Sequence, residues 1–260
     1  MKLVILCGGL GTRIRDVTEV LPKPMIPIGG MPILWHIMKS YSFHGVRDFV
    51  LCLGYQGWQI KDFFINYRAK TSDCSLCIGR PDEIRYHDEL DEYDWNITLA
   101  ETGQNTNTGG RVFKIRKYVE NDAHFCLTYG DGVADVNIAE LIRHHERSGL
   151  AATITGVKVR ERFGELQYDG DRVVSFAEKP LVTTGRINGG FMVFDAKRIW
   201  KYFDPDEKLV LEREPMERLG RDGQIGLFKH DGFWQCMDTP REYALLNQMW
   251  AEGNAPWKVW

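Results

Sequence analysis

Short apolar runs alternate with helical patterns through the first half of the chain. The runs Leu3 to Cys7 and Asp48 to Leu53 are almost wholly hydrophobic and predict buried strands. Between and after them, Pro32 to Phe43 and Trp58 to Tyr67 repeat apolar residues at helical spacing. This strand-helix-strand-helix order predicts a parallel sheet covered by helices.

The alternation continues after one interruption. The segment Gly79 to Asp94 is dense in charge and breaks the rhythm, which predicts an exposed loop or hairpin excursion. Trp95 to Glu101 and Ala123 to Thr128 predict two further strands, and Gly110 to Val119 predicts a helix with its apolar residues on one face. The second of these strands runs directly into a Tyr-Gly-Asp-Gly turn at 129–132.

The pattern changes after a predicted helix at Ile138 to Arg147. Short strand-like runs now follow one another, and an Asp-Gly-Asp hairpin signal at 169–171 joins two of them, which predicts a mixed sheet. The predicted strands are Ala152 to Val159, Phe163 to Tyr168, Arg172 to Phe176 and Ile187 to Phe194, and the predicted helices are Ala196 to Tyr202, Pro215 to Leu219 and Pro240 to Ala251. We expect an α/β, Rossmann-like fold with a mixed, mainly parallel central sheet flanked by helices, in one domain over 1–260 with halves at about 1–135 and 136–260.

Composition narrows the possible partners. The formal net charge is -3 over 260 residues, which argues against a broad electrostatic grip on nucleic acid or an anionic membrane. No apolar stretch approaches the ~20 residues that span a bilayer. The apolar run at the start of the chain is too short for a signal peptide. We therefore expect a cytoplasmic protein, and any phosphate binding must be local.

The six cysteines are expected to be reduced and structural, because most lie inside apolar runs. Cys74 and Cys77 form a C-x-x-C spacing, but a structural zinc site would need a second ligand pair. An ordinary strand is the better interpretation of this pair.

The segment GGLGTR at 8–13 follows the first predicted strand, where glycine loops often bind phosphate. A dinucleotide fingerprint would require a third glycine where Ile14 stands, and a P-loop would require G-K-S or G-K-T where the chain has Thr12 and Arg13. Both motifs therefore fail. A glycine cradle for an anion, with Arg13 as a forked cation, remains possible, and so does a plain structural turn.

Lys23 stands between Pro22 and Pro24. The two prolines fix the backbone and remove its donors, so the ammonium is carried on a stiff support suited to a transient negative charge. A solvated proline-rich turn is the alternative interpretation.

These segments, together with TYGDG, FAEKP and INGG, resemble the sugar nucleotidylyltransferases, and within them the glucose-1-phosphate cytidylyltransferases. Matching stretches such as WNITLAETG and GFWQCMDTPRE are spread over nearly the whole chain. The resemblance implies the fold of the nucleotide-diphospho-sugar transferases, with a smaller β-rich sugar-binding part. It implies transfer of CMP from CTP to α-D-glucose 1-phosphate, giving CDP-glucose and pyrophosphate. Alternatives are the same chemistry with dTTP or UTP, or with another phosphorylated or phosphonylated acceptor, and a catalytically silent nucleotide-sugar sensor.

This reaction requires cations and no general base. The sugar phosphate is already an anionic nucleophile near neutral pH, so catalysis should be positioning plus stabilisation of the charge that develops on the phosphates. The resemblance implies that the glycine loop cradles the triphosphate, that Arg13 neutralises its β- and γ-oxygens, that Lys23 contacts the α-phosphate, and that Lys179 holds the phosphate of the sugar. The expected catalytic residues are Arg13, Lys23 and Asp131.

Magnesium is the implied cofactor. Mg²⁺ is usually held by one or two carboxylates plus substrate phosphates, and Asp131 and Asp238 match the family pattern. Asp131 also follows a buried strand, at the sheet edge where ligands gather. Asp238 could instead belong to the N-cap of the last helix. Asp135 is expected to cap the helix that follows it.

The remaining contacts follow from the resemblance. Thr108 and Arg111 are expected at the pyrimidine edge, and Asn188, Gly189 and Glu178 at the sugar hydroxyls. The implied nucleotide-binding residues are Leu6, Gly8, Gly9, Gly11, Thr12, Arg13, Lys23, Thr108, Gly109, Arg111 and Gly130. The implied sugar-phosphate-binding residues are Glu178, Lys179, Asn188 and Gly189. A homo-oligomer, trimer or hexamer, is also implied, with the excursion at 79–94 helping subunits meet.

Overall fold

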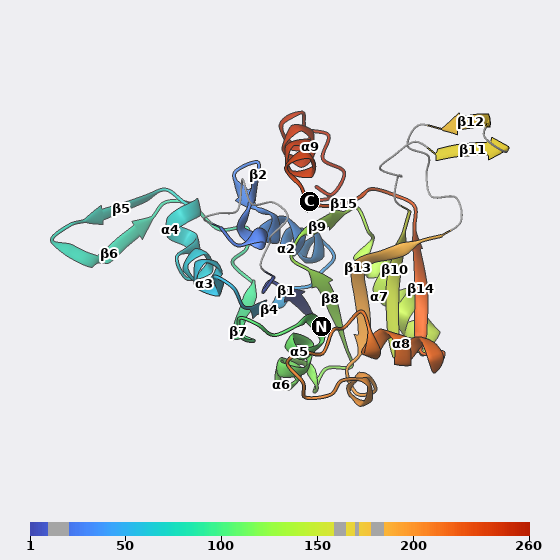
Figure 1. The fold of residues 1–260 in the computed structure, drawn as a ribbon. Coiled ribbons are helices and arrows are strands. Elements are labelled where there is room, and N and C mark those ends of the chain that lie inside the picture. The colour runs from blue at the N-terminus through green and yellow to red at the C-terminus, as the bar shows by residue number, and fades with distance from the viewer. Residues whose placement is uncertain (10–20, 159–164, 170–171, 178–184) are drawn as a thin grey trace.

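The computed structural model describes all of the chain except residues 10–20, 159–164, 170–171 and 178–184. Its centre is a seven-stranded sheet (Figure 1). In spatial order the strands are β14 (Ile225–His230), β10 (Ala152–Val157), β13 (Ile187–Asp195), β8 (His124–Tyr129), β1 (Lys2–Leu6), β4 (Asp48–Leu53) and β7 (Asn96–Glu101). Within this sheet only β13 runs antiparallel to its neighbours, so the predicted mixed, mainly parallel sheet is confirmed.

Helices cover both faces of the sheet. The helices among the described residues are α2 (Ile33–Phe43), α3 (Gly57–Ile65), α4 (Tyr67–Thr71), α5 (Thr108–Lys114), α6 (Arg116–Val119), α7 (Ile138–Ser148), α8 (Glu214–Arg221) and α9 (Pro240–Ala251), with 3-10 turns η1 (Lys23–Met25) and η2 (Ile199–Tyr202). Leu3 and Ile5 of β1 pack into the core beneath α2, α7 and α9, whereas Val4 and Leu6 pack into the core beneath α5, α6, η2 and α8. Alternation along the strand therefore supplies both cores.

Three predicted helices differ from the observed elements for local reasons. The segment after Asp195 begins as a turn, because the Asp195 carboxylate accepts the backbone N–H groups of Lys197 and Arg198, and only η2 follows. The helix predicted to end at Tyr67 ends at Ile65, and the next residue, Asn66, donates both its backbone N–H and its side-chain amide to the carbonyl of Asp62. The helix predicted at 110–119 is divided at Ile115, whose backbone leaves the helical range.

The predicted cap at Asp135 is wrong. Asn137 directly precedes α7, and its Oδ1 accepts the N–H of Glu140 at 3.0 Å. Asp135 lies two residues earlier, and its Oδ1 lies 2.9 Å from Nε2 of His230. Asn137 is therefore the N-cap of α7, because its side chain reaches a backbone N–H of the first turn.

Besides the main sheet, the described part of the chain forms four small antiparallel pairs of strands. They are β2 (Pro27–Ile28) with β3 (Met31–Pro32), β5 (Cys74–Cys77) with β6 (Arg80–Tyr86), β9 (Gly132–Ala134) with β15 (Trp234–Cys236), and β11 (Glu165–Asp169) with β12 (Arg172–Ala177). The β5-β6 hairpin projects far from the sheet (Figure 1). The C-x-x-C pair is thus an ordinary exposed strand, as predicted, and all six cysteines are free.

Among the residues that the structure describes, no helix has the length and apolar character needed to cross a membrane.

Candidate active site

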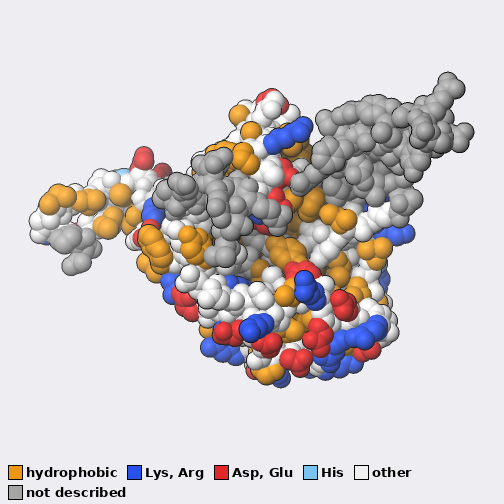
Figure 2. Space-filling view, in the orientation of Figure 1, with side chains coloured by type: hydrophobic (Ala, Val, Ile, Leu, Met, Phe, Trp, Pro, Cys, Tyr) orange, Lys and Arg blue, Asp and Glu red, His pale blue; other side chains and the backbone are white. Residues whose placement is uncertain are grey.

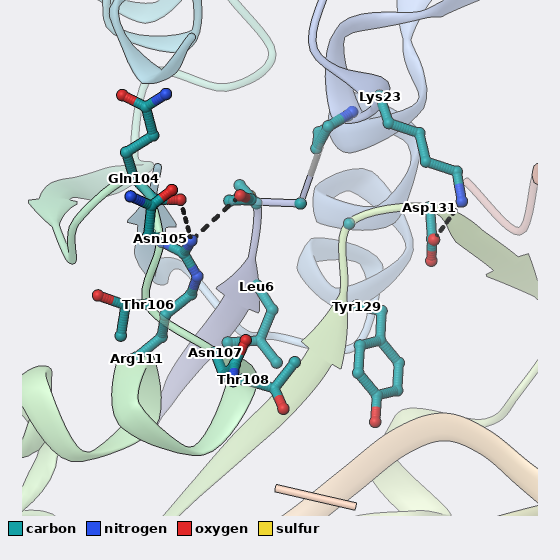
Figure 3. Close-up of a pocket in the computed structure, with 15 residues that line it drawn as sticks. Leu6, Lys23, Gln104, Asn105, Thr106, Asn107, Thr108, Arg111, Tyr129 and Asp131 are labelled. Atoms are coloured by element: carbon teal, nitrogen blue, oxygen red, sulfur yellow. Dashed lines mark hydrogen bonds and ion pairs between the residues drawn. The ribbon is translucent and has the colours of Figure 1, made fainter. Parts of the chain in front are cut away.

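A pocket of about 410 Å³ lies where β1 and β8 end (Figure 3). Register explains its place: Leu6 of β1 is paired with Tyr129 of β8, so the loops that follow these two parallel strands start side by side. The pocket is lined by Leu6, Cys7, Gly8, Gly9, Lys23, Pro24, residues 104–108, Arg111, Tyr129, Gly130 and Asp131. Eight of the residues expected to bind the nucleotide or metal, namely Leu6, Gly8, Gly9, Lys23, Thr108, Arg111, Gly130 and Asp131, therefore face one cavity.

Lys23 lies between the two aspartates expected to bind metal. Its Nζ lies 2.6 Å from Oδ2 of Asp131 and also pairs with Oδ1 of Asp238. Burial alone would lower the pKa of the Lys23 ammonium, but the two carboxylates outweigh burial and raise it above its usual value. The lysine is therefore held fully charged at the edge of the pocket.

Pairing of short strands brings the two aspartates together. Asp131 directly precedes β9, which pairs with β15, so that Gly132 faces Cys236, and the carbonyl of Asp131 accepts the N–H of Met237 at 2.8 Å. Asp238 follows immediately. The N-cap of α9 is Thr239 and not Asp238, since Thr239 forms a capping box with Glu242. The Asp238 carboxylate thus faces Lys23.

Proline and glycine place the lysine. Lys23 begins η1, with Pro22 extended before it. Pro24 rests against Gly130, where an added Cβ would lie 3.1 Å from the Pro24 ring and from the carbonyl of Leu6. Because Gly130 has no side chain, the Pro24 ring can pack against it at the end of β1.

The donor set fits a hard divalent cation. Two carboxylates already share one positive group, the ammonium of Lys23, and oxygen ligands are those that Mg²⁺ prefers. Within the described parts of the chain, no cluster of three or more His, Cys, Asp or Glu side chains could hold a metal by itself. A cation bound by Asp131 and Asp238 would therefore complete its shell with phosphate oxygens and water, as Mg²⁺ does in nucleotide sites.

Arg111 organises the walls of the pocket. Its guanidinium donates to the carbonyls of Leu53, Gly8 and Gln104 and to Oγ1 of Thr102, at 2.7–3.3 Å. The bonds to Gly8 and Gln104 are the dashed lines at Arg111 in Figure 3. The residue is only 4% exposed, and burial lowers its pKa from the usual value. These bonds join the end of β4, the glycine loop and the loop before α5, a role that sequence reasoning missed. The pyrimidine contact expected of Arg111 stays a prediction.

Other expected residues lie around this centre. An added Cβ on Gly109 would lie 2.8 Å from Leu209, so this glycine admits a protein segment. Asn188 accepts the N–H of Gly190 at 2.8 Å, and the carbonyl of Gly189 accepts the Trp234 indole N–H at 2.7 Å. The residues Gly11, Thr12, Arg13, Glu178 and Lys179 lie outside the described part of the chain.

Sequence reasoning also missed the polar run at 104–107 and Tyr129. The run Gln-Asn-Thr-Asn directly after a predicted strand was the available signal for the first. Tyr129 adjoins the TYGDG motif, but nothing in its local pattern separates a pocket tyrosine from a core tyrosine.

Comparison with known proteins defines the class. Residues 2–213 match the Nucleotidyl transferase family, and the chain belongs to that family. The predicted family is therefore confirmed. Over the full length of both chains it is 45% identical to the glucose-1-phosphate cytidylyltransferases of Salmonella typhi and Salmonella typhimurium.

Solved structures agree on the fold. The crystal structure of HddC from Yersinia pseudotuberculosis has a TM-score of 0.67 at 26% identity, covering 96% of this chain and 99% of the other. The inositol-1-phosphate CTP transferase from T. maritima has a TM-score of 0.63 at 16% identity, covering 95% of each chain. The second likeness concerns the fold alone.

Proposed function

We propose that this protein is a glucose-1-phosphate cytidylyltransferase, which transfers CMP from CTP to α-D-glucose 1-phosphate and releases pyrophosphate. Full-length identity of 45% to enzymes of that name supports the substrates. The observation in the structure that carries the proposal is the ion cluster of Lys23 with Asp131 and Asp238 at the edge of a pocket lined by the glycine loop.

The reaction is a displacement at phosphorus. An oxygen of the sugar phosphate attacks the α-phosphorus of CTP, and the bond from that phosphorus to the bridging oxygen of pyrophosphate breaks. The nucleophile is already ionised, so no side chain needs to remove a proton. The protein must bring two anions together and stabilise the charge that develops.

The site residues divide this work in our proposal. Gly8, Gly9 and Gly11 present backbone N–H groups to the triphosphate, and Arg13 neutralises its outer phosphates. Lys23 stabilises the α-phosphate under attack. Asp131 and Asp238 hold Mg²⁺, which when bound supplies charge neutralisation and polarisation of phosphate oxygens. The flexible stem of Lys23 would let its ammonium turn from the carboxylates to the phosphate.

Recognition of the base and sugar completes the proposal. Thr108, Gly109 and Arg111 are the proposed contacts of the pyrimidine. Asn188, Gly189 and Glu178 bind the sugar hydroxyls, and Lys179 binds the sugar phosphate. Thr108 and Arg111 line the pocket, which supports their proposed contact with the pyrimidine.

We also propose a homo-oligomer built with the projecting hairpin. Leu76, Ile78 and Ile84 are exposed on β5-β6, with Ile78 86% exposed, and Tyr93 beyond it is 84% exposed. Figure 2 shows hydrophobic side chains gathered along this projection. Clustered exposed apolar groups are typical of protein interfaces. Light scattering after gel filtration should show a multimer, and a monomer at micromolar concentration would contradict it.

A pyrophosphate-release assay tests the function. The purified chain is supplied with Mg²⁺, each of CTP, UTP, dTTP and GTP in turn, and glucose 1-phosphate or another sugar phosphate. We expect turnover with CTP and glucose 1-phosphate above all other pairs. Turnover only with a different triphosphate would keep the family chemistry and overturn the substrate assignment.

A further inference from the structure

Glu212, which has no part in the proposed chemistry, joins two residues of the pocket wall. The Tyr129 hydroxyl donates to Oε1 of Glu212 at 2.5 Å, and the Thr108 hydroxyl donates to Oε2 at 2.7 Å. Tyr129 ends β8 and Thr108 begins α5, so one carboxylate connects two elements that are distant in sequence. Both hydroxyl-bearing residues line the pocket.

The segment that carries Glu212 is fitted closely against α5. The N–H of Gly110 donates to the carbonyl of Leu209 at 3.1 Å, and an added Cβ on Gly110 would lie 2.7 Å from the carbonyl oxygen of Asp206. The N–H of Leu211 donates to Oγ1 of Thr108 at 2.9 Å. The hydroxyl of Thr108 therefore accepts from Leu211 and has its own hydrogen available for Glu212.

Tyr129 extends from Glu212 toward the proposed sugar contacts. Gly190 has φ +84°, and an added Cβ there would lie 2.7 Å from the Tyr129 ring, so the ring packs directly on this glycine. Asn188 stabilises the same segment, since its Oδ1 accepts the N–H of Gly190 at 2.8 Å. Burial, reinforced by the charge of Glu212, raises the pKa of the Tyr129 phenol, which therefore stays protonated and remains a donor.

We propose that Glu212 is a positioning residue: it fixes the Tyr129 ring between the nucleotide pocket and the 188–190 segment, and so sets the approach of the sugar phosphate to the α-phosphate. The inference rests on the proposed function. A carboxylate with each oxygen bound to a different element limits movement of both. Because a misplacement of about 1 Å can cost about 100-fold in rate, this fixation acts on kcat more than on substrate binding.

A double-mutant cycle tests the proposal in the full chain. Glu212→Ala should lower kcat about 100-fold, and the Kd of CTP, measured by calorimetry with Mg²⁺, should change less than about threefold. Tyr129→Phe should show a similar loss, and adding Glu212→Ala to it should cost less than about threefold more, since the carboxylate acts through the phenol. Glu212→Gln should recover at least about tenfold, because the amide oxygen still accepts the Tyr129 hydrogen bond.

Glu214→Ala is the matched control, since Glu214 is also exposed, lies two residues away and pairs only loosely with Arg218 at 3.6 Å. Equal kcat in Glu212→Ala and Glu214→Ala would overturn the inference, as would losses at Glu212 and Tyr129 that multiply. If Glu212→Ala does not fold, Tyr129→Phe decides by itself, because it removes the same hydrogen bond: a kcat within about threefold of that of the unmodified chain would overturn the inference. Absent CTP turnover in the unmodified chain would instead overturn the proposed function, and the cycle would then use the substrate pair that the chain does accept.

Discussion

Nζ of Lys23 lies 2.6 Å from Oδ2 of Asp131, although 108 positions separate the two residues in the sequence. The pair joins the proline-flanked lysine to the carboxyl end of a central strand. The Lys23 ammonium thus lies between two carboxylates. Under the proposed metal site, a divalent ion and the lysine would compete for these two carboxylates.

Replacing Asp131 by Asn should reduce kcat by about 100-fold or more, because the amide weakens the proposed ligand for the cation that neutralises the phosphates. Kinetics across a Mg²⁺ titration check this, with circular dichroism to show that the variant is folded. Asp122→Asn is the control, since Asp122 also pairs with a lysine, Lys2, at 2.7 Å. Equal activity in the two variants would refute the role of Asp131.

Replacing Lys23 by Met should have two opposite effects. We expect kcat to fall about 100-fold, since the α-phosphate loses its cation. We also expect Mn²⁺ to bind more tightly without nucleotide, because Asp131 and Asp238 lose their internal counter-ion. Electron paramagnetic resonance of free Mn²⁺ measures the second effect independently of activity. Weaker Mn²⁺ binding than in the unmodified chain would contradict the competition.

Gly8→Ala should destabilise the fold by about 1–3 kcal/mol, because the new methyl would overlap the Arg111 guanidinium, which four hydrogen bonds hold in place. Gly9→Ala is the matched control, since nothing lies within 4 Å of its added Cβ. Urea unfolding of both variants should show a loss for Gly8 alone. An equal loss at Gly9 would mean that general loop conformation, and not Arg111, is responsible.

Acidification should destabilise the protein through His36. Burial lowers the pKa of this histidine from 6.5 to about 4. Its Nε2 lies 2.8 Å from the carbonyl of Ile28, and its Nδ1 accepts the indole N–H of Trp257 at 3.4 Å, an arrangement of the neutral ring. In the unfolded chain, His36 binds a proton below about pH 6.5, whereas in the folded chain it binds one only below about pH 4.

The contribution of His36 is therefore complete above pH 6.5 and is lost as the pH falls toward 4, by about 3 kcal/mol. Urea unfolding at pH 7.5, 5.5 and 4.5 measures it, and His36→Gln should flatten the dependence. His145, whose pKa burial also lowers to about 4, should leave a residual slope in that variant. An unchanged slope in His36→Gln would contradict the assignment.

Local pattern was enough to predict much of the fold. Strand β4 and helix α9 were predicted at their observed bounds, because a buried apolar run and a helical period ended by a glycine are properties of neighbouring residues. The glycine loop, Lys23, Asp131 and Asp238 could be selected as candidates from motifs, since each motif is contiguous in the chain.

Only the tertiary structure decided how the candidates work together. The partners of Arg111, the meeting of Asp131 with Asp238 at Lys23, and the bonds of Glu212 to Tyr129 and Thr108 join residues that are distant in sequence. Such contacts depend on strand order and register, which follow from the packing of the whole sheet and leave no local periodic signal. The sequence by itself determined the elements and the chemical groups at their ends, and the assembled sheet determined which of those groups share one pocket.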